Sequence, residues 1–133
     1  MREPHHRAKI KNILQKFAKK FGVILISGAN VGNHLHLEIR IANRQTYRPF
    51  IRAVTAAIAM AITGTSRWNP KKIKFWDHRP FSRIAETWKE VLNLRDYIRI
   101  NQLEGRGIHR EEARVVITRK TEPPGKKFLR LEI

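Results

Sequence analysis

Two histidines and a tyrosine are the residues of this sequence best placed to do chemistry. His34 and His36 lie two residues apart in residues 33–41, where apolar and polar side chains alternate. In a β-strand this alternation puts both histidines on one face, with Cβ atoms about 6.5–7 Å apart at a rise of ~3.3 Å per residue. Two imidazoles at this spacing can bind one divalent ion and leave positions open for phosphate oxygens. The alternative is a solvent-facing strand that carries two histidines without a ligand role.

Further polar residues recur at steps of four in the segment that follows residue 86. Asn93, Tyr97 and Asn101 share one face if this segment is a helix. An unassisted phenol is a poor nucleophile near neutral pH because its pKa is about 10. It becomes competent when a metal polarises the phosphate that it attacks. The alternative is an amphipathic tyrosine at the edge of the core.

Glu38, on the polar face of the histidine strand, either supports the site or pairs with Arg40.

Apolar periodicity predicts the elements that position these residues. Steps of three and four predict helices at 5–21, about 46–63 and 86–104. Short apolar or alternating runs predict strands at 23–27, 33–41, 73–76, 81–85 and 114–118, with a turn at 28–32 and a hairpin turn at 77–80. The order predicts an α+β domain over residues 1–118, with helices packed on a mostly antiparallel sheet. Residues 119–133 are predicted to be a basic linker and an extended tail.

Composition and charge narrow the class of protein. The chain has 133 residues, 41% of them hydrophobic, which is enough for one domain with a real core. Lys and Arg number 28 against 11 acidic residues, so the net charge is +17. This excess predicts a polyanionic partner, nucleic acid first, with a ribosomal or merely adhesive basic protein as the alternative.

The absence of cysteine excludes disulfides, thiolate zinc sites and a cysteine nucleophile. The longest weakly polar run, at residues 53–63, is much shorter than the ~20 residues of a membrane span. The first fifteen residues lack the apolar core of a secretory signal. We therefore expect a soluble protein of the cytoplasm with no membrane partner.

Two stretches resemble a known family of enzymes. ANVGNHLHLEI resembles the histidine-hydrophobe-histidine (HUH) motif of single-tyrosine transposases, and RDYIRINQLEG resembles their Tyr-x-x-x-Asn motif. The two occur in the expected order, about sixty residues apart, with an alanine-rich helix between them. The chain is similar to the insertion-sequence and REP-associated tyrosine transposases of bacteria over about residues 5–105.

The resemblance implies a specific site and reaction. His34 and His36 become metal ligands, with Asn101 or its neighbour Gln102 as the third ligand, and Tyr97 becomes the nucleophile. The four-residue step favours Asn101, because Gln102 lies about 100° further round the helix. The implied cofactor is Mg²⁺ or Mn²⁺, and the implied substrate is single-stranded or hairpin DNA. A homodimer would nick and rejoin this DNA through a 5′-phosphotyrosine intermediate, with the tyrosine acting in its own subunit or across the dimer.

The resemblance also implies a ferredoxin-like antiparallel sheet with helices packed on one face. Members of the family usually open with a strand, but residues 1–4 are too few to form one. Either the sheet is one strand short, or a neighbouring molecule or residues 128–133 fill the gap, or the protein is a truncated, inactive copy. The last case keeps open the alternative function, a non-catalytic protein that binds nucleic acid or DNA hairpins.

Basic side chains are expected to form the DNA surface, because phosphate contacts dominate affinity for nucleic acid. Trp68 or Trp76 can stack on an unpaired base. The candidate basic residues are Arg40, Arg44, Arg48, Arg52, Arg67, Lys71, Lys72, Lys74 and Arg79.

Overall fold

The fold is known from a computed structural model that describes residues 3–116 and 128–132. Its helices are α1 (Pro4–Phe21), α2 (Tyr47–Thr63), α3 (Trp88–Gly105) and α4 (Arg110–Val116), with a 3-10 turn η1 (Arg44–Thr46) before α2. Its strands are β1 (Val23–Asn30), β2 (Leu35–Ile41), β3 (Phe81–Ala85) and β4 (Phe128–Glu132). The three predicted helices and the strands predicted at 33–41 and 81–85 are confirmed, with ends that shift by one or two residues.

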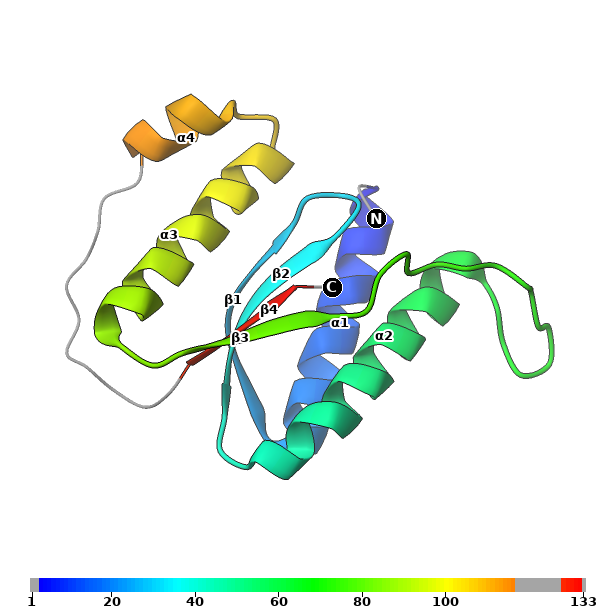
Figure 1. Cartoon of the computed structure of the whole chain (residues 1–133). Coiled ribbons are helices and arrows are strands. Elements are labelled where there is room, and N and C mark those ends of the chain that lie inside the picture. The colour runs from blue at the N-terminus through cyan, green and yellow to red at the C-terminus, as the bar shows by residue number, and fades with distance from the viewer. Residues whose placement is uncertain (1–2, 117–127, 133) are drawn as a thin grey trace.

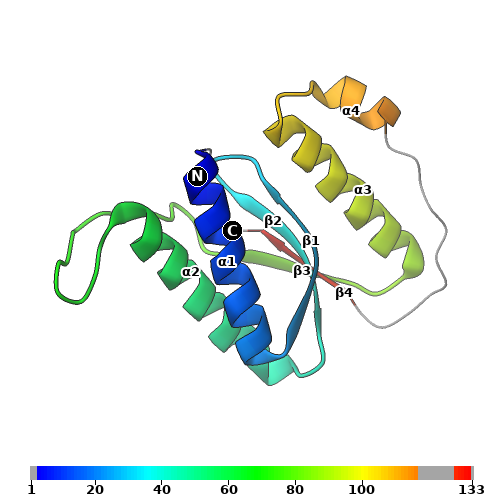
Figure 2. The same cartoon turned by 180° about the vertical axis from the view of Figure 1, so that it is seen from behind.

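The four strands form one sheet in the order β1-β2-β4-β3, and every neighbouring pair is antiparallel. Helices α1 and α2 cover one face, and α3 covers the other (Figures 1 and 2). The predicted α+β class is confirmed. The packing of α3 on the second face goes beyond the prediction, which put the helices on one face.

The main core lies between the sheet and the pair α1–α2. Helix α1 buries Ile10, Leu14 and Ala18 at steps of four, and α2 buries Phe50, Val54 and Ile58 in the same way. Leu35, Leu37 and Ile39 point into this core from β2. The alternation of β2 therefore leaves His36 and Glu38 on the opposite face, toward α3.

A smaller core and a capping box hold α3 in place. Val91, Leu94 and Ile98 pack with Ala29 of β1 and Ala85 of β3. The helix begins at a capping box, in which the Thr87 hydroxyl accepts from the Glu90 N–H and the Glu90 carboxylate accepts from the Thr87 N–H. These contacts fix where the helix starts and which side of it faces the sheet.

Strand β4 settles the question of the gap in the sheet. It lies between β2 and β3 and pairs with both, from Ile39↔Leu129 to His36↔Glu132 on one side and from Ala85↔Phe128 to Phe81↔Glu132 on the other. In a ferredoxin-like sheet this central, doubly antiparallel place belongs to the first strand. Of the alternatives that the sequence left open, the filling of the gap by the C-terminal residues is confirmed.

Two local predictions on the N-terminal side of β3 were wrong. Residues 73–76 form no strand, because Phe75 and Trp76 pack against the α1–α2 core and the Trp76 indole N–H donates to the Thr55 carbonyl at 2.9 Å. Residues 28–30, predicted to lie in a turn, continue β1 and pair with Leu37, His36 and Leu35. Gly28 suits this close pairing, because a Cβ there would lie 2.9 Å from the Leu37 side chain.

One prediction for the C-terminal part also differs from the structure. The prediction of a strand at 114–118 was wrong for residues 114–116, because these residues form the end of α4. Residues 117 and 118 lie outside the described residues. Glu111 and Glu112 occupy the first turn of α4, where acidic side chains complement the helix dipole. Residues 128–132 of the predicted tail form β4, which lies between β2 and β3 in the sheet. Residues 119–127 of the predicted linker lie outside the described residues.

The C-terminal end of α3 approaches the sheet closely at Gly105. A Cβ at this position would lie 2.7 Å from the carbonyl oxygen of Asn30, a backbone atom that cannot move alone. The Arg7 guanidinium also donates to the Gly105 carbonyl at 2.9 Å, so α1 reaches the same point. The absence of a side chain at Gly105 therefore sets the distance of α3 from β1.

We predict that Gly105→Ala lowers the free energy of unfolding by about 1–3 kcal/mol, because the added methyl group forces α3 away from Asn30. Helix propensity alone would favour alanine by about 1 kcal/mol, so the sign of the change is informative. Urea unfolding measures it. Arg106→Ala, at the exposed neighbouring position, serves as the control and should stay within about 0.5 kcal/mol of wild type. A more stable Gly105→Ala protein would contradict the prediction.

Candidate catalytic and metal site

The two histidines lie side by side at the start of β2. His34 is half-buried in the turn before the strand, where its carbonyl accepts from the Val31 N–H at 3.2 Å. His36 is the second residue of β2, and its side chain is completely buried beneath α3. The two imidazole rings have centroids 4.6 Å apart and lie nearly perpendicular to each other.

A carboxylate from β4 joins the two histidines. Glu132 pairs with His36 in the ladder, and its Oε2 lies 3.5 Å from the Nδ1 of His36. The potential ligand atoms of His34, His36 and Glu132 all lie within 4.8 Å of one another. Two imidazoles and a carboxylate are a donor set that suits divalent first-row metals. Sequence reasoning did not single out Glu132, whose one signal was a carboxylate in a weakly alternating C-terminal run.

The tyrosine predicted as nucleophile lies beside the histidines. Tyr97 projects from α3, and its ring meets the His36 ring edge to face, with centroids 5.1 Å apart. The Tyr97 side chain is half-buried. The structure thus brings together His34, His36 and Tyr97, which are separated by about sixty residues in the sequence.

The two candidates for a ligand on α3 have other contacts. Asn101 is buried, and its amide Nδ2 donates to the carbonyl of Tyr97, one turn earlier in α3, at 2.7 Å. Gln102 donates from Nε2 to the carbonyl of Gly28 at 2.7 Å and so ties α3 to β1. Both amides therefore brace the helix that carries the tyrosine.

Glu38 takes part in a contact between β2 and α3. Its side chain is fully buried and accepts from the Arg95 guanidinium Nε and from the Ser27 hydroxyl, each at 3.0 Å. Arg95 also lies over the Trp88 ring, 5.4 Å from its centroid. Of the two roles open to Glu38, pairing with Arg40 is replaced by pairing with Arg95, two residues before Tyr97.

Comparison with known proteins identifies the family to which the chain belongs. The sequence model of the family described as "Transposase IS200 like" matches residues 1–101. The chain belongs to this family. No curated protein and no solved structure gives a significant match. The matched region contains both histidines and the tyrosine, and it ends at Asn101.

Membership gives the chain a transposase role, in DNA transposition and recombination, with DNA as its partner. Among the described residues, no helix combines the length and the apolar character needed to cross a membrane. The His34–His36–Glu132 cluster is a place where this transposase can hold a metal ion.

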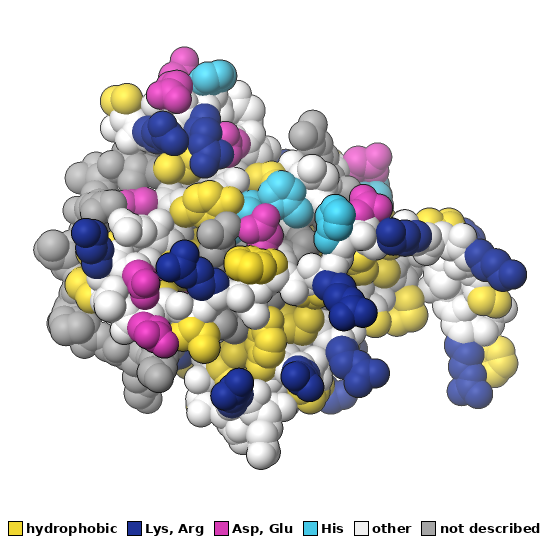
Figure 3. Space-filling view, in the orientation of Figure 1, with side chains coloured by type: hydrophobic (Ala, Val, Ile, Leu, Met, Phe, Trp, Pro, Cys, Tyr) yellow, Lys and Arg dark blue, Asp and Glu magenta, His cyan; other side chains and the backbone are white. Residues whose placement is uncertain are grey.

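The basic residues predicted to contact DNA fall into two groups. Arg40 is half-buried on β2, whereas η1 and α2 expose Arg44, Arg48 and Arg52 at steps of four along one side. The connection of residues 64–80, here called the arm, projects from the body (Figure 1). It exposes Arg67, Lys71, Lys72, Lys74 and Arg79. Figure 3 shows Lys and Arg side chains on both sides of the surface histidines and along the arm.

The two tryptophans of the arm have different roles. Trp68 is 89% exposed, and the Arg67 guanidinium lies 5.7 Å from its ring centroid. Trp76 is half-buried and anchors the arm to α2 through its bond to Thr55. Of the two tryptophans predicted to stack on a base, only Trp68 presents an open ring.

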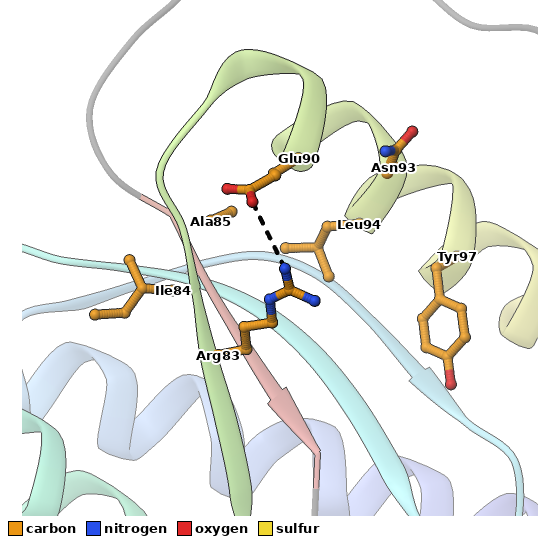
Figure 4. Close-up of a pocket in the computed structure, with 7 residues that line it drawn as sticks. All are labelled: Arg83, Ile84, Ala85, Glu90, Asn93, Leu94 and Tyr97. Atoms are coloured by element: carbon orange, nitrogen blue, oxygen red, sulfur yellow. Dashed lines mark ion pairs between the residues drawn. The ribbon is translucent and has the colours of Figure 1, made fainter.

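A cavity of about 250 Å³ opens next to the tyrosine, between β3 and α3 (Figure 4). The ion pair of Arg83 with Glu90, at 3.6 Å, crosses one side of it. Hydrogen bonds from the N–H groups of Glu86 and Thr87, together with the Arg83 charge, lower the pKa of the Glu90 carboxyl. The residues that line the cavity are Arg83, Ile84, Ala85, Glu90, Asn93, Leu94 and Tyr97.

We predict that Arg95→Met lowers the free energy of unfolding by about 3 kcal/mol, because it leaves the Glu38 carboxylate buried without its cation. Chemical denaturation measures the loss. Arg114→Met, which breaks an exposed pair with Glu111, is the matched control and should cost less than about 1 kcal/mol. Equal losses of unfolding free energy in the two variants would show that the buried ion pair stabilises the protein no more than an exposed one.

Proposed function

We propose that this transposase nicks and rejoins single-stranded DNA through a covalent link between Tyr97 and a 5′-phosphate. The observation that carries the proposal is the meeting of three rings, with centroid distances of 4.6 Å from His34 to His36 and 5.1 Å from His36 to Tyr97. The tyrosine and the two imidazoles come from different elements and converge on one side of the sheet. Membership in the IS200-like family supports the same reading.

The histidines would hold a divalent ion, Mg²⁺ or Mn²⁺. The fit of the residues to a metal is supported by ligand atoms of His34, His36 and Glu132 within 4.8 Å of one another. Ligands bonded to one ion at about 2.1 Å are roughly 3–4.2 Å apart, so small side-chain rotations suffice. Such an ion supplies Lewis-acid polarisation of the scissile phosphate. The family resemblance adds Asn101 as a ligand, which stays a prediction.

Tyr97 performs the covalent step. Its phenolic oxygen attacks phosphorus, the bond from phosphorus to the 3′ oxygen breaks, and the protein keeps the 5′ phosphate. The proton lost from the phenol is balanced by the proton gained by the departing 3′ oxygen. The half-buried ring, packed edge to face on His36, limits the orientations of the hydroxyl. The cavity beside Tyr97 offers space for part of the neighbouring nucleotide.

The link preserves the energy of the broken phosphodiester, so a second 3′-hydroxyl can reverse the step and join two strands. The single-stranded DNA is proposed to contain a hairpin and to be bound by a homodimer, with Tyr97 acting in its own subunit or across the dimer. The family resemblance supports these features.

The exposed basic residues would bind the DNA backbone. Among the described residues, none of the nine candidates forms an ion pair with an acidic side chain, so their charges are available to phosphates. Binding to single strands should then weaken with salt, by a slope of roughly −0.7 for each phosphate neutralised.

We predict that Tyr97→Phe abolishes a covalent protein–DNA adduct. The assay mixes the full chain with labelled single-stranded hairpin oligonucleotides and Mn²⁺, and a denaturing gel separates the adduct. Phenylalanine keeps the ring contact with His36 but lacks the nucleophilic oxygen, so folding and DNA binding should persist while the adduct is lost.

Tyr47→Phe is the matched control, because Tyr47 is the other tyrosine and packs against the α1–α2 core. This variant should form the adduct at the wild-type level. His34→Ala should also lose it, and circular dichroism should show that the variant is folded. DNA binding with no adduct in wild type would favour a protein that binds hairpins without cutting them.

We predict that Trp68→Ala weakens binding to single-stranded DNA by roughly 5–150-fold, the equivalent of about 1–3 kcal/mol for one stacked base. Fluorescence anisotropy at one fixed salt concentration measures the affinity. Trp68→Phe should retain most of it, because the smaller ring still stacks. Ile73→Ala removes another exposed apolar side chain from the arm and should have little effect. A change below about 2-fold for Trp68→Ala would exclude stacking on this residue.

A further inference from the structure

The central strand of the sheet carries a carboxylate to the histidines. Glu132 is the partner of His36 in the β2–β4 ladder, and directly opposed residues of an antiparallel pair project from the same face of the sheet. That face is the one covered by α3, where Tyr97 lies. The strand register therefore puts Glu132, the histidines and the tyrosine on one side of the sheet.

The distance of Glu132 from His36 and the exposure of its side chain suit a ligand of an ion that enters from solvent. The Oε2 of Glu132 lies 3.5 Å from the Nδ1 of His36, and the group of three ligand atoms spans no more than 4.8 Å. Glu132 is 31% exposed and His36 is fully buried, so the cluster opens to solvent on the carboxylate side. A substrate phosphate can approach from that side.

The charge of Glu132 distinguishes it from the amide candidates. A carboxylate adds one negative charge to two neutral imidazoles and raises the affinity for a divalent ion, whereas an amide adds none. The Nδ2 of Asn101 donates within α3 and the Nε2 of Gln102 donates to β1, each at 2.7 Å, and both bonds leave the amide oxygen, the atom that binds a cation, unused. The carboxylate therefore adds charge to a site that can also include an amide oxygen.

We propose that Glu132 is a further protein ligand of the ion held by His34 and His36, in addition to the amide that the family resemblance gives to the site. This inference rests on the proposed metal-dependent function. The element that fills the gap in the sheet would then also complete the metal site.

The test is Mn²⁺ binding to the full chain without DNA, followed by electron paramagnetic resonance of free Mn²⁺ and by the shift in melting temperature. Glu132→Gln keeps the size of the side chain and removes its charge, so affinity should fall roughly 10-fold or more and the thermal shift at a fixed Mn²⁺ concentration should shrink.

Glu104→Gln is the matched control, because Glu104 is also a half-buried carboxylate, 27% exposed, but lies in α3 in a pair with Arg110. It removes the same charge and should leave Mn²⁺ affinity unchanged. Glu132→Asp keeps the charge on a shorter side chain and should retain more affinity than Glu132→Gln. This comparison separates a ligand from a residue that only pairs with His36.

Two results would overturn the inference, and they have different consequences. If Glu132→Gln binds Mn²⁺ like wild type while His34→Ala does not, the histidine site stands and Glu132 is not its ligand. If His34→Ala also binds like wild type, or wild type does not bind, the metal site fails and the proposed metal-dependent function fails with it.

Discussion

The geometry of the site depends on the buried ion pair between Glu38 of β2 and Arg95 of α3. Burial of a lone carboxylate is costly, and here the cost is offset by the guanidinium and by the Ser27 hydroxyl, each 3.0 Å away. The apolar core beneath α3 is small, so this polar contact has a large share in fixing the helix. It joins the residue two positions after His36 to the residue two positions before Tyr97. The same pair that docks the helix therefore aligns the tyrosine with the imidazoles.

Strand β4 connects the stability of the sheet with the chemistry of the site. It is paired on both sides, so β3 depends on it for its ladder hydrogen bonds and β2 depends on it along the edge that does not pair with β1. Its register with β2 puts Glu132 opposite His36, and a shift of one residue would turn the carboxylate to the other face. The order of the strands, more than any local motif, determines what surrounds the histidines.

The sequence predicted those parts of the fold that depend on local periodicity. The alternation of residues 35–41 and the four-residue steps of α1 and α3 are visible in one segment at a time. The sequence-based prediction failed where contacts between distant residues determine the local structure. One such place is Trp76, in a segment predicted to be a strand, which packs on α2 instead. Glu132 could not be found in this way, because it meets His36 only through the pairing of strands 96 positions apart in the sequence. The motifs predict which residues take part in the proposed reaction, and the strand topology shows which residues surround them.

The candidate metal site and the proposed DNA surface differ in the sign of their charge. The chain has a net charge of +17, and its arm and α2 expose cations with no acidic partner among the described residues. Around the histidines, by contrast, Glu132 supplies negative charge. A phosphate attracted by the basic surface would be repelled there by the carboxylate, unless a divalent cation reversed the local sign. On the proposed assignment, the basic surface concentrates DNA in general, and the carboxylate makes entry of the scissile phosphate conditional on a bound ion.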